Sequence, residues 1–250
     1  DGDRIRVADT YRIAWRAMAA TTGFRTFYPS VIPPGARHIH GIHTAGPIGD
    51  EDGVLAGAFA ATILNDFLIR SIGLSNLYGP SFENLVCSAR GHAKCLLVKE
   101  FLRLNGLTSA YASIWGSATG LHWDSSVPYR MAEDRRLAQI RIDVAAAIAL
   151  GITADDLCTI YRTQFPVMRR YDQENRYDAN GRLVPGEVMK LQKKRGDDEV
   201  LSEAERTWTH PQSGVEYTFE YPFRQLDREA DMRAAYARLE AELAQCDVDN

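Results

Sequence analysis

Two periodicities of apolar and polar side chains divide the chain into predicted strands and predicted helices. In residues 1–46 the two kinds alternate in short runs such as Tyr11–Arg16 and Arg37–His40, and turn residues such as Pro33-Pro34-Gly35 separate the runs. A period of two with this punctuation predicts short strands, most simply antiparallel. The run at Tyr11 is also compatible with a helix.

Helical spacing begins at Val54. Apolar residues recur every three or four positions to Ile72, which predicts an amphipathic helix that ends at Gly73 and has Asp52 as its cap. The same signals predict helices over His92–Leu104, Met131–Leu150, Thr153 to before Pro166, and Asp227–Ala244. Residues 105–128 are predicted to be a loop with at most a short helix, and residues 208–223 a hairpin. We therefore expect an α+β fold of short antiparallel strands packed with about four to six helices, without a catalytic Rossmann domain.

The composition is that of a globular protein with a substantial core. Of the 250 residues, 45% are apolar and 25% charged, which excludes disordered and collagen-like chains. This length suits one large domain or two small ones. The sequence contains no linker or repeat, and we place a boundary near residue 100, with a strand and helix part in 1–100 and a helical, basic part with the hairpin in 101–250.

The charge is unevenly distributed although the net charge is only −4. Residues 197–250 hold 14 acidic and 5 basic side chains, so residues 1–196 carry an excess of five positive charges. The excess is concentrated in residues 162–196, where nine Lys or Arg stand against four acids and are interleaved with Tyr171 and Tyr177. Such a segment can neutralise phosphates, or it can be an ordinary solvated face.

Catalytic signatures are missing from the sequence. It has no Gly-x-Gly-x-x-Gly, phosphate-binding loop, His-Glu-x-x-His or Gly-x-Ser-x-Gly motif. His38, His40 and His43 are more simply strand residues than metal ligands, and the group Cys87, His92 and Cys95 lacks a fourth ligand nearby. We expect no catalytic residue and no metal in this chain.

No stretch is long and apolar enough to predict a membrane span, and the four widely spaced cysteines suggest a reducing, cytoplasmic location. Because the first residue is Asp1 and no signal segment precedes it, we expect the chain to begin inside a longer polypeptide.

Several stretches are similar to one protein family. They are Tyr11–Arg16, Gly23–Gly35, Leu55–Ile72, the region Ile140–Gly186 with its pairs Ile142-Asp143, Tyr171-Asp172 and Tyr177-Asp178, and Asp227–Met232. In these the chain resembles the C-terminal target-recognition region of type IIG-like restriction-modification and phage-defence adenine-specific DNA methyltransferases.

The resemblance implies that a parent protein binds S-adenosylmethionine upstream and methylates adenine, while this chain recognises the DNA sequence. The chain itself lacks the cofactor motif and the Pro-Pro-Tyr methyl-transfer motif, so no cofactor is expected in it and its own activity is in doubt. The implied partners are double-stranded DNA and the upstream methyltransferase domain. The oligomeric state stays open.

Charged side chains supply the candidate DNA contacts, because Lys and Arg bind phosphates while Arg and His can also read bases. The candidates for base contact are Arg25, Arg37, His38 and His40. The candidates for backbone contact are Arg169, Arg170, Arg176, Arg182, Lys190, Lys193 and Lys194.

Two other functions stay open. One is a protein–protein interaction module or defence-complex subunit that docks through the acidic tail and the last helix. The other is a small hydrolase that uses His38, His40 and Asp50.

Overall fold

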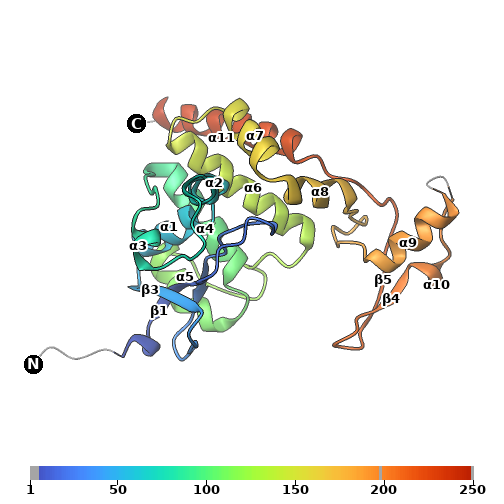
Figure 1. The fold of residues 1–250 in the computed structure, drawn as a ribbon, viewed down its shortest axis with the longest axis horizontal. Helices are drawn as coiled ribbons and strands as arrows, with labels where there is room; N and C mark the ends of the chain where they lie inside the picture. The colour runs from blue at the N-terminus through green and yellow to red at the C-terminus, as the bar shows by residue number, and fades with distance from the viewer. Residues whose placement is uncertain (1–5, 197–198, 249–250) are drawn as a thin grey trace, which may run out of the picture.

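The computed structural model describes residues 6–196 and 199–248. Its elements are η1 (Val7–Asp9), β1 (Tyr11–Arg16), β2 (Ser30–Ile32), β3 (Ile42–Ile48), α1 (Glu51–Ala60), α2 (Ile63–Ile72), α3 (Gly79–Glu83), α4 (Gly91–Asn105), η2 (Ser109–Tyr111), α5 (Ala112–Thr119), α6 (Ala132–Ala149), α7 (Ala154–Gln164), α8 (Pro166–Glu174), α9 (Gly186–Arg195), α10 (Glu203–Arg206), β4 (Thr207–Thr209), β5 (Glu216–Thr218) and α11 (Arg228–Val248). This is an α+β fold, as expected, with more helices than the sequence pattern predicts (Figure 1).

An antiparallel sheet with the strand order β2-β1-β3 forms the first layer. Its central strand buries Ile13 and Trp15, and the Trp15 indole donates a hydrogen bond to the Leu77 carbonyl oxygen at 2.8 Å. The predicted strand at Tyr11 is therefore confirmed. The predicted strand over Arg37–His40 is wrong, because these four exposed residues lie in the loop between β2 and β3 and pair with no strand. Residues 1–5 of the predicted strand region lie outside the described residues.

The single helix expected from Val54 to Ile72 is two helices that meet at 58°. Thr62 caps α2 by accepting a hydrogen bond from the Asn65 amide, and Asp143 accepts another from the amide of Ile63 at 2.7 Å. These acceptors satisfy amides that a continuous helix would have paired internally. The cap of α1 is Asp50 rather than the expected Asp52.

Within the described residues, no single helix has the length and apolar character needed to cross a membrane, although the bent α1–α2 pair passes that test when its halves are joined.

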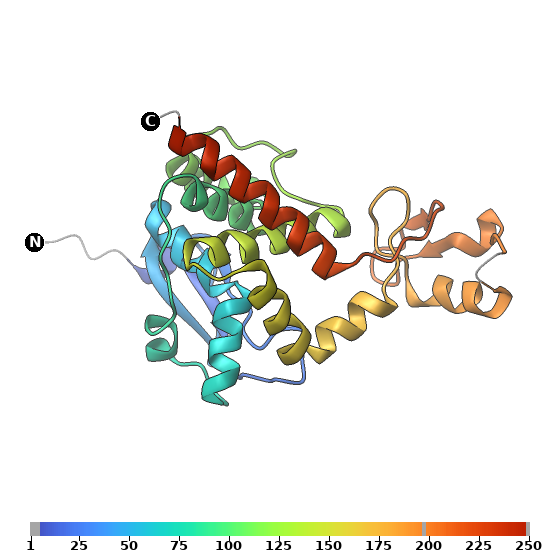
Figure 2. The ribbon, with the colours of Figure 1, turned by 90° about the horizontal axis from the view of Figure 1, so that it is seen from above.

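Helix α6 runs through the centre of the main body and packs against α4 and α11 (Figures 1 and 2). The predicted positions of α4, α6, α7 and α11 are confirmed to within a few residues, and Thr153 caps α7 as expected. The central position of α6 leaves Ile140, Ile142 and Val144 almost fully buried, so the helix is apolar around more than one face.

A second, smaller core lies outside the main body. It consists of Val184, Val188, Leu201 and Phe219, and it belongs to a small lobe that we define as residues 176–224. The lobe carries α9, α10 and the β4–β5 hairpin and projects from one end of the molecule (Figures 1 and 2). Two backbone hydrogen bonds between Tyr177 and Arg224, of 2.8 and 2.7 Å, join the chain segments that enter and leave it.

One core spans the boundary expected near residue 100. Helix α4 crosses that position, and Leu97, Phe101 and Leu102 all belong to the core that also contains Ile13 and Leu239. Residues from 1–100 and from 101–250 pack in the same core, and local sequence patterns do not reveal such long-range contacts. The division instead falls where the chain enters and leaves the small lobe.

Gly57 provides a test of packing in the main core. A Cβ atom there would lie 2.5 Å from Ile13 Cδ1 and 2.7 Å from Phe101 Cε1, although alanine favours helix formation. We expect Gly57→Ala to lower the free energy of unfolding by about 1–2 kcal/mol, because overpacking outweighs the helix preference. Urea denaturation measures this.

The matched control is Gly116→Ala in α5, where the nearest atom to a new Cβ is the Leu121 carbonyl oxygen at 3.8 Å. This variant should be more stable than the wild type by about 0.5–1 kcal/mol. Equal shifts of the same sign in the two variants would contradict the close packing around Gly57.

Candidate nucleic-acid interface

The candidate base-contacting residues do not all lie on the surface. Arg37, His38 and His40 are exposed in the loop between β2 and β3. Arg25 is buried, and its Nη2 donates a hydrogen bond to Asp143 Oδ2 at 3.0 Å. The expectation that Arg25 projects toward DNA is therefore wrong in this structure, because a buried carboxylate on α6 holds its guanidinium in the core.

The candidate backbone-contacting residues lie on α8, on α9 and in the segment between them. Lys190, Lys193 and Lys194 are exposed on α9 and form no ion pair with a described residue. Their spacing of three and four positions places Lys190 on the same side of the helix as the other two.

The arginines of this segment differ in how far they are already engaged. Arg170 is exposed and lies over the Tyr171 ring, whereas Arg169 and Arg176 are partly buried and donate to backbone carbonyl oxygens. Arg182 donates two hydrogen bonds to Asp178 Oδ2, at 2.9 and 2.7 Å. Arg182 is therefore bound to an internal carboxylate, and a DNA phosphate would have to compete with it.

Acidic side chains neutralise much of the basic charge of the small lobe. Besides Arg182, the arginines Arg195, Arg206 and Arg224 pair with Glu205, Glu220 and Glu133. Among the described residues, the positive charge of the lobe that stays outside ion pairs is concentrated at Arg176 and the three lysines of α9.

The structure does not bring the two groups of candidates together. The β2–β3 loop belongs to the sheet at one end of the molecule, while α9 lies at the other end, as both views show (Figures 1 and 2). A ligand that touches both groups must therefore extend along the long axis of the protein.

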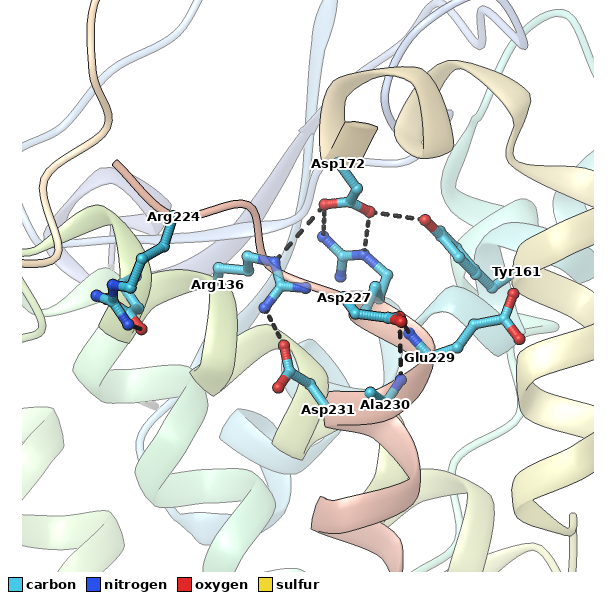
Figure 3. Close-up of polar contacts among 10 residues, drawn as sticks. Arg136, Tyr161, Asp172, Arg224, Asp227, Glu229, Ala230 and Asp231 are labelled. Atoms are coloured by element: carbon cyan, nitrogen blue, oxygen red, sulfur yellow. Dashed lines mark hydrogen bonds and ion pairs between the residues drawn. The ribbon is translucent and has the colours of Figure 1, made fainter. Parts of the chain in front are cut away.

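A buried charge cluster lies where the small lobe joins the main body (Figure 3). The carboxylate of Asp172 at the end of α8 accepts hydrogen bonds from Arg228 Nε at 2.6 Å, Arg228 Nη2 at 3.2 Å and the Tyr161 hydroxyl at 2.8 Å. Arg136 Nε on α6 lies 3.6 Å from the same carboxylate. We call these four residues the junction cluster.

Neighbouring residues extend the junction cluster along α11. Asp231 accepts a hydrogen bond from Arg136 Nη1, and Asp227 caps α11 by accepting from the backbone amides of Glu229 and Ala230 at 2.9 and 3.1 Å. Arg224 pairs with Glu133 at 2.7 Å at the edge of the same region (Figure 3). Arg224 and the first turn of α11 are thus tied to α6 and α8.

Burial and pairing determine the ionisation of the junction cluster. Burial and the neighbouring Asp172 carboxylate raise the pKa of the Tyr161 hydroxyl, which keeps it a donor. Burial alone would lower the pKa of Arg228, but its hydrogen bonds and charge interaction with Asp172 outweigh burial and raise it. The cluster therefore contains an ion pair that joins α8 to α11.

Sequence patterns do not reveal the junction cluster. Arg136 is an ordinary helix residue by its spacing, and nothing local links it to Asp172 or Arg228. The only signal was indirect, since Tyr171-Asp172 and Asp227–Met232 belong to the stretches that carry the family resemblance. Those stretches supply the Asp172–Arg228 contact, which joins α8 to the start of α11.

The groups considered for metal binding do not form a site in the part of the chain that the structure describes. There, no group of three or more His, Cys, Asp or Glu side chains is arranged to hold a metal ion. His43 instead packs edge-on against Tyr78, with ring centroids 5.4 Å apart. Asp50, the third residue of the hydrolase alternative, caps α1.

No family model, no curated protein and no solved structure matches this chain in the comparisons.

Replacing Arg228 tests the junction cluster. In Arg228→Gln the largely buried carboxylate of Asp172 loses two charge-assisted hydrogen bonds, and we expect the free energy of unfolding to fall by about 3–5 kcal/mol. The control is Arg238→Gln on the same helix, where an 82% exposed side chain pairs with Glu242 and the loss should stay below about 0.5 kcal/mol. Urea denaturation measures both values. If the two variants lost similar amounts of unfolding free energy, the Arg228–Asp172 ion pair would not be the stabilising contact proposed here.

A second test concerns pH and Asp178. Burial alone would raise the pKa of this carboxyl, but hydrogen bonds from the amide and guanidinium of Arg182 and the amide of Glu220 outweigh it and lower the pKa below 3.8. Because the folded state binds this proton less tightly than the unfolded state, the stabilisation is present above that pH and is lost as pH falls below it.

We therefore expect the stability difference between wild type and Asp178→Asn to be largest above pH 4 and to shrink toward about pH 2. Denaturation across this range measures it. Glu174→Gln, which changes an exposed acid that makes no side-chain hydrogen bond with a described residue, should follow the wild-type curve. If the stability difference between wild type and Asp178→Asn did not change with pH, the lowered pKa of Asp178 would be refuted.

Proposed function

We propose that this chain is the DNA sequence-recognition part of an S-adenosylmethionine-dependent adenine DNA methyltransferase or restriction-modification enzyme. The observation that carries the proposal is the exposed group of Lys190, Lys193 and Lys194, which form no ion pair with a described residue. The family resemblance supplies the reaction and the cofactor of the parent protein. We expect the chain to bind duplex DNA without catalysing methyl transfer alone.

The physical basis is the release of counterions from DNA. Each phosphate neutralised by a lysine releases condensed cations, so the logarithm of affinity falls with the logarithm of salt concentration by about 0.9 per contact. Lysines on a helix can follow a phosphate backbone without reading bases. The exposed Arg37, His38 and His40 lie on a different element and are the remaining candidates for groove contact.

An interaction module is the second candidate function. Its support is an apolar surface on the small lobe, an open hollow of about 530 Å³ whose wall includes Leu183, Trp208 and Tyr217. We propose the upstream methyltransferase domain as the partner in that case. The acidic tail is less suited to this task than expected, because Met232 and Leu239 of α11 are buried in the main core.

Salt titration of DNA binding tests the primary function. We expect the variant with Lys190, Lys193 and Lys194 all changed to Ala to bind duplex DNA more weakly and with a log–log salt slope smaller by about 2–3. Fluorescence anisotropy with a labelled duplex measures both quantities.

The control is Lys99→Ala, which removes an exposed lysine on α4. It should change the slope by less than about 1. Equal slopes in the wild type and the triple variant would reject the α9 contact. Wild-type affinity that does not depend on salt would reject phosphate binding altogether and favour the interaction module.

A further inference from the structure

A pocket of about 400 Å³ opens in the main body, away from α9 and the small lobe. It lies between the chain segment before β2, the end of α4, the η2 turn and the side of α6 that carries Arg135, Gln139 and Ile142. Its volume is in the range of small-molecule sites. Neither the DNA contacts proposed above nor the junction cluster uses it.

Aromatic side chains form much of the wall. Phe24 and Tyr28 come from the segment before β2, and Tyr111 from the turn before α5. Two of these rings are fixed by their hydroxyl groups: Tyr111 donates to the Val31 carbonyl oxygen at 3.0 Å, and the Tyr28 oxygen accepts from the Arg25 amide at 2.8 Å. Held rings of this kind offer flat faces on which a planar ligand can stack.

The polar part of the wall is positive. Arg25 and Arg135 line the pocket, and no Asp or Glu is among the described residues of its wall. Asp143 already pairs with Arg25, but Arg135 has no carboxylate partner among the described residues and uses one nitrogen, Nη1, to bind the carbonyl oxygens of Leu104 and Tyr129. Burial lowers the pKa of Arg135, so this guanidinium has lost hydration without gaining a counterion.

Gln139 lies one helical turn after Arg135 on α6 and also lines the pocket. Its amide makes no hydrogen bond with a described residue, in contrast to Asn105, whose amide is used by Ser30, Val31 and Phe101. A free carboxamide offers a donor beside an acceptor, which is the pattern that pairs with the edge of a nucleobase. A free guanidinium edge matches a phosphate.

We propose that this pocket binds one nucleotide, with the base stacked on the aromatic wall and paired with Gln139, and the phosphate bound to Arg135. The ligand is either a free nucleotide or a nucleotide unit of a DNA strand, which present the same groups. The proposal does not depend on the DNA-recognition function, because its residues lie on other elements than α9.

Calorimetry with dAMP, deoxyadenosine and deoxyribose 5-phosphate tests the ligand class on the full chain. We expect one saturable site for dAMP, binding at least about tenfold weaker without the phosphate, and no measurable binding without the base. Gln139→Leu and Arg135→Gln should each weaken dAMP binding by at least about tenfold. Lys99→Gln, which removes an exposed positive charge on α4, should bind dAMP as the wild type does.

A single-stranded oligonucleotide containing 2-aminopurine separates the two sources. If dAMP does not bind but the strand shows quenched fluorescence that Gln139→Leu abolishes, the ligand is a nucleotide of DNA. If neither probe binds saturably, or if both pocket variants bind like the wild type, the proposal is wrong. Thermal unfolding of Gln139→Leu verifies its fold, and the α9 triple-lysine variant should retain dAMP binding even if DNA binding is lost.

Discussion

One largely buried carboxylate joins the two helices that flank the small lobe. Asp172 stands at the end of α8, the last helix before the lobe, and accepts hydrogen bonds from Arg228, the first residue of the helix that returns from it. The ion pair therefore joins the last helix before the small lobe to the first helix after it. The two cores are separate clusters of side chains, and the lobe contacts the main body through the Arg224–Glu133 ion pair and a hydrogen bond from the Glu133 amide to the Gly181 carbonyl oxygen.

The junction cluster continues into the main core as a series of alternating charges. Arg25 pairs with Asp143, whose charge is attracted to that of Arg228 without a hydrogen bond or ion pair between them, and contacts continue from Arg228 through Asp172 and Arg136 to Asp231. An unpaired buried ion costs several kcal/mol, so each member requires its neighbours. This requirement explains why a basic residue such as Arg25, which by sequence is a plausible DNA ligand, serves the interior. It also explains the bend between α1 and α2, because Asp143 accepts the Ile63 amide that the bend exposes.

Local pattern predicted much of the fold and little of its polar interior. The helices α4, α6, α7 and α11 follow from apolar spacing and caps such as Thr153, since those signals act within a few residues. The break after Ala60 was missed although Thr62 is a local cap signal, because apolar spacing continues across it and the second acceptor, Asp143, lies 80 residues further along the chain. The strand expected at Arg37–His40 is absent because four alternating residues form a strand only when a neighbouring strand pairs with them, and none does here.

The candidate site residues likewise separate into those whose exposure follows from the sequence and those whose partners only the tertiary structure shows. The exposure of Lys190, Lys193 and Lys194 agrees with what their charge predicts, whereas Arg182 and Arg25 occupy internal ion pairs that only tertiary structure reveals. This division matters for the proposed function. Phosphate contacts fix the register of a protein on DNA only when their positions are fixed relative to the residues that read bases. The lysines of α9 and the β2–β3 loop lie at opposite ends of the molecule, so any register between them depends on the contacts that join the small lobe to the main body. These include the Arg224–Glu133 ion pair and the hydrogen bond from the Glu133 amide to the Gly181 carbonyl oxygen. If the chain recognises DNA as proposed, a lobe free to rotate about Tyr177 and Arg224 would attract DNA without aligning it, so the contacts that fix the lobe would then matter for recognition as much as for folding.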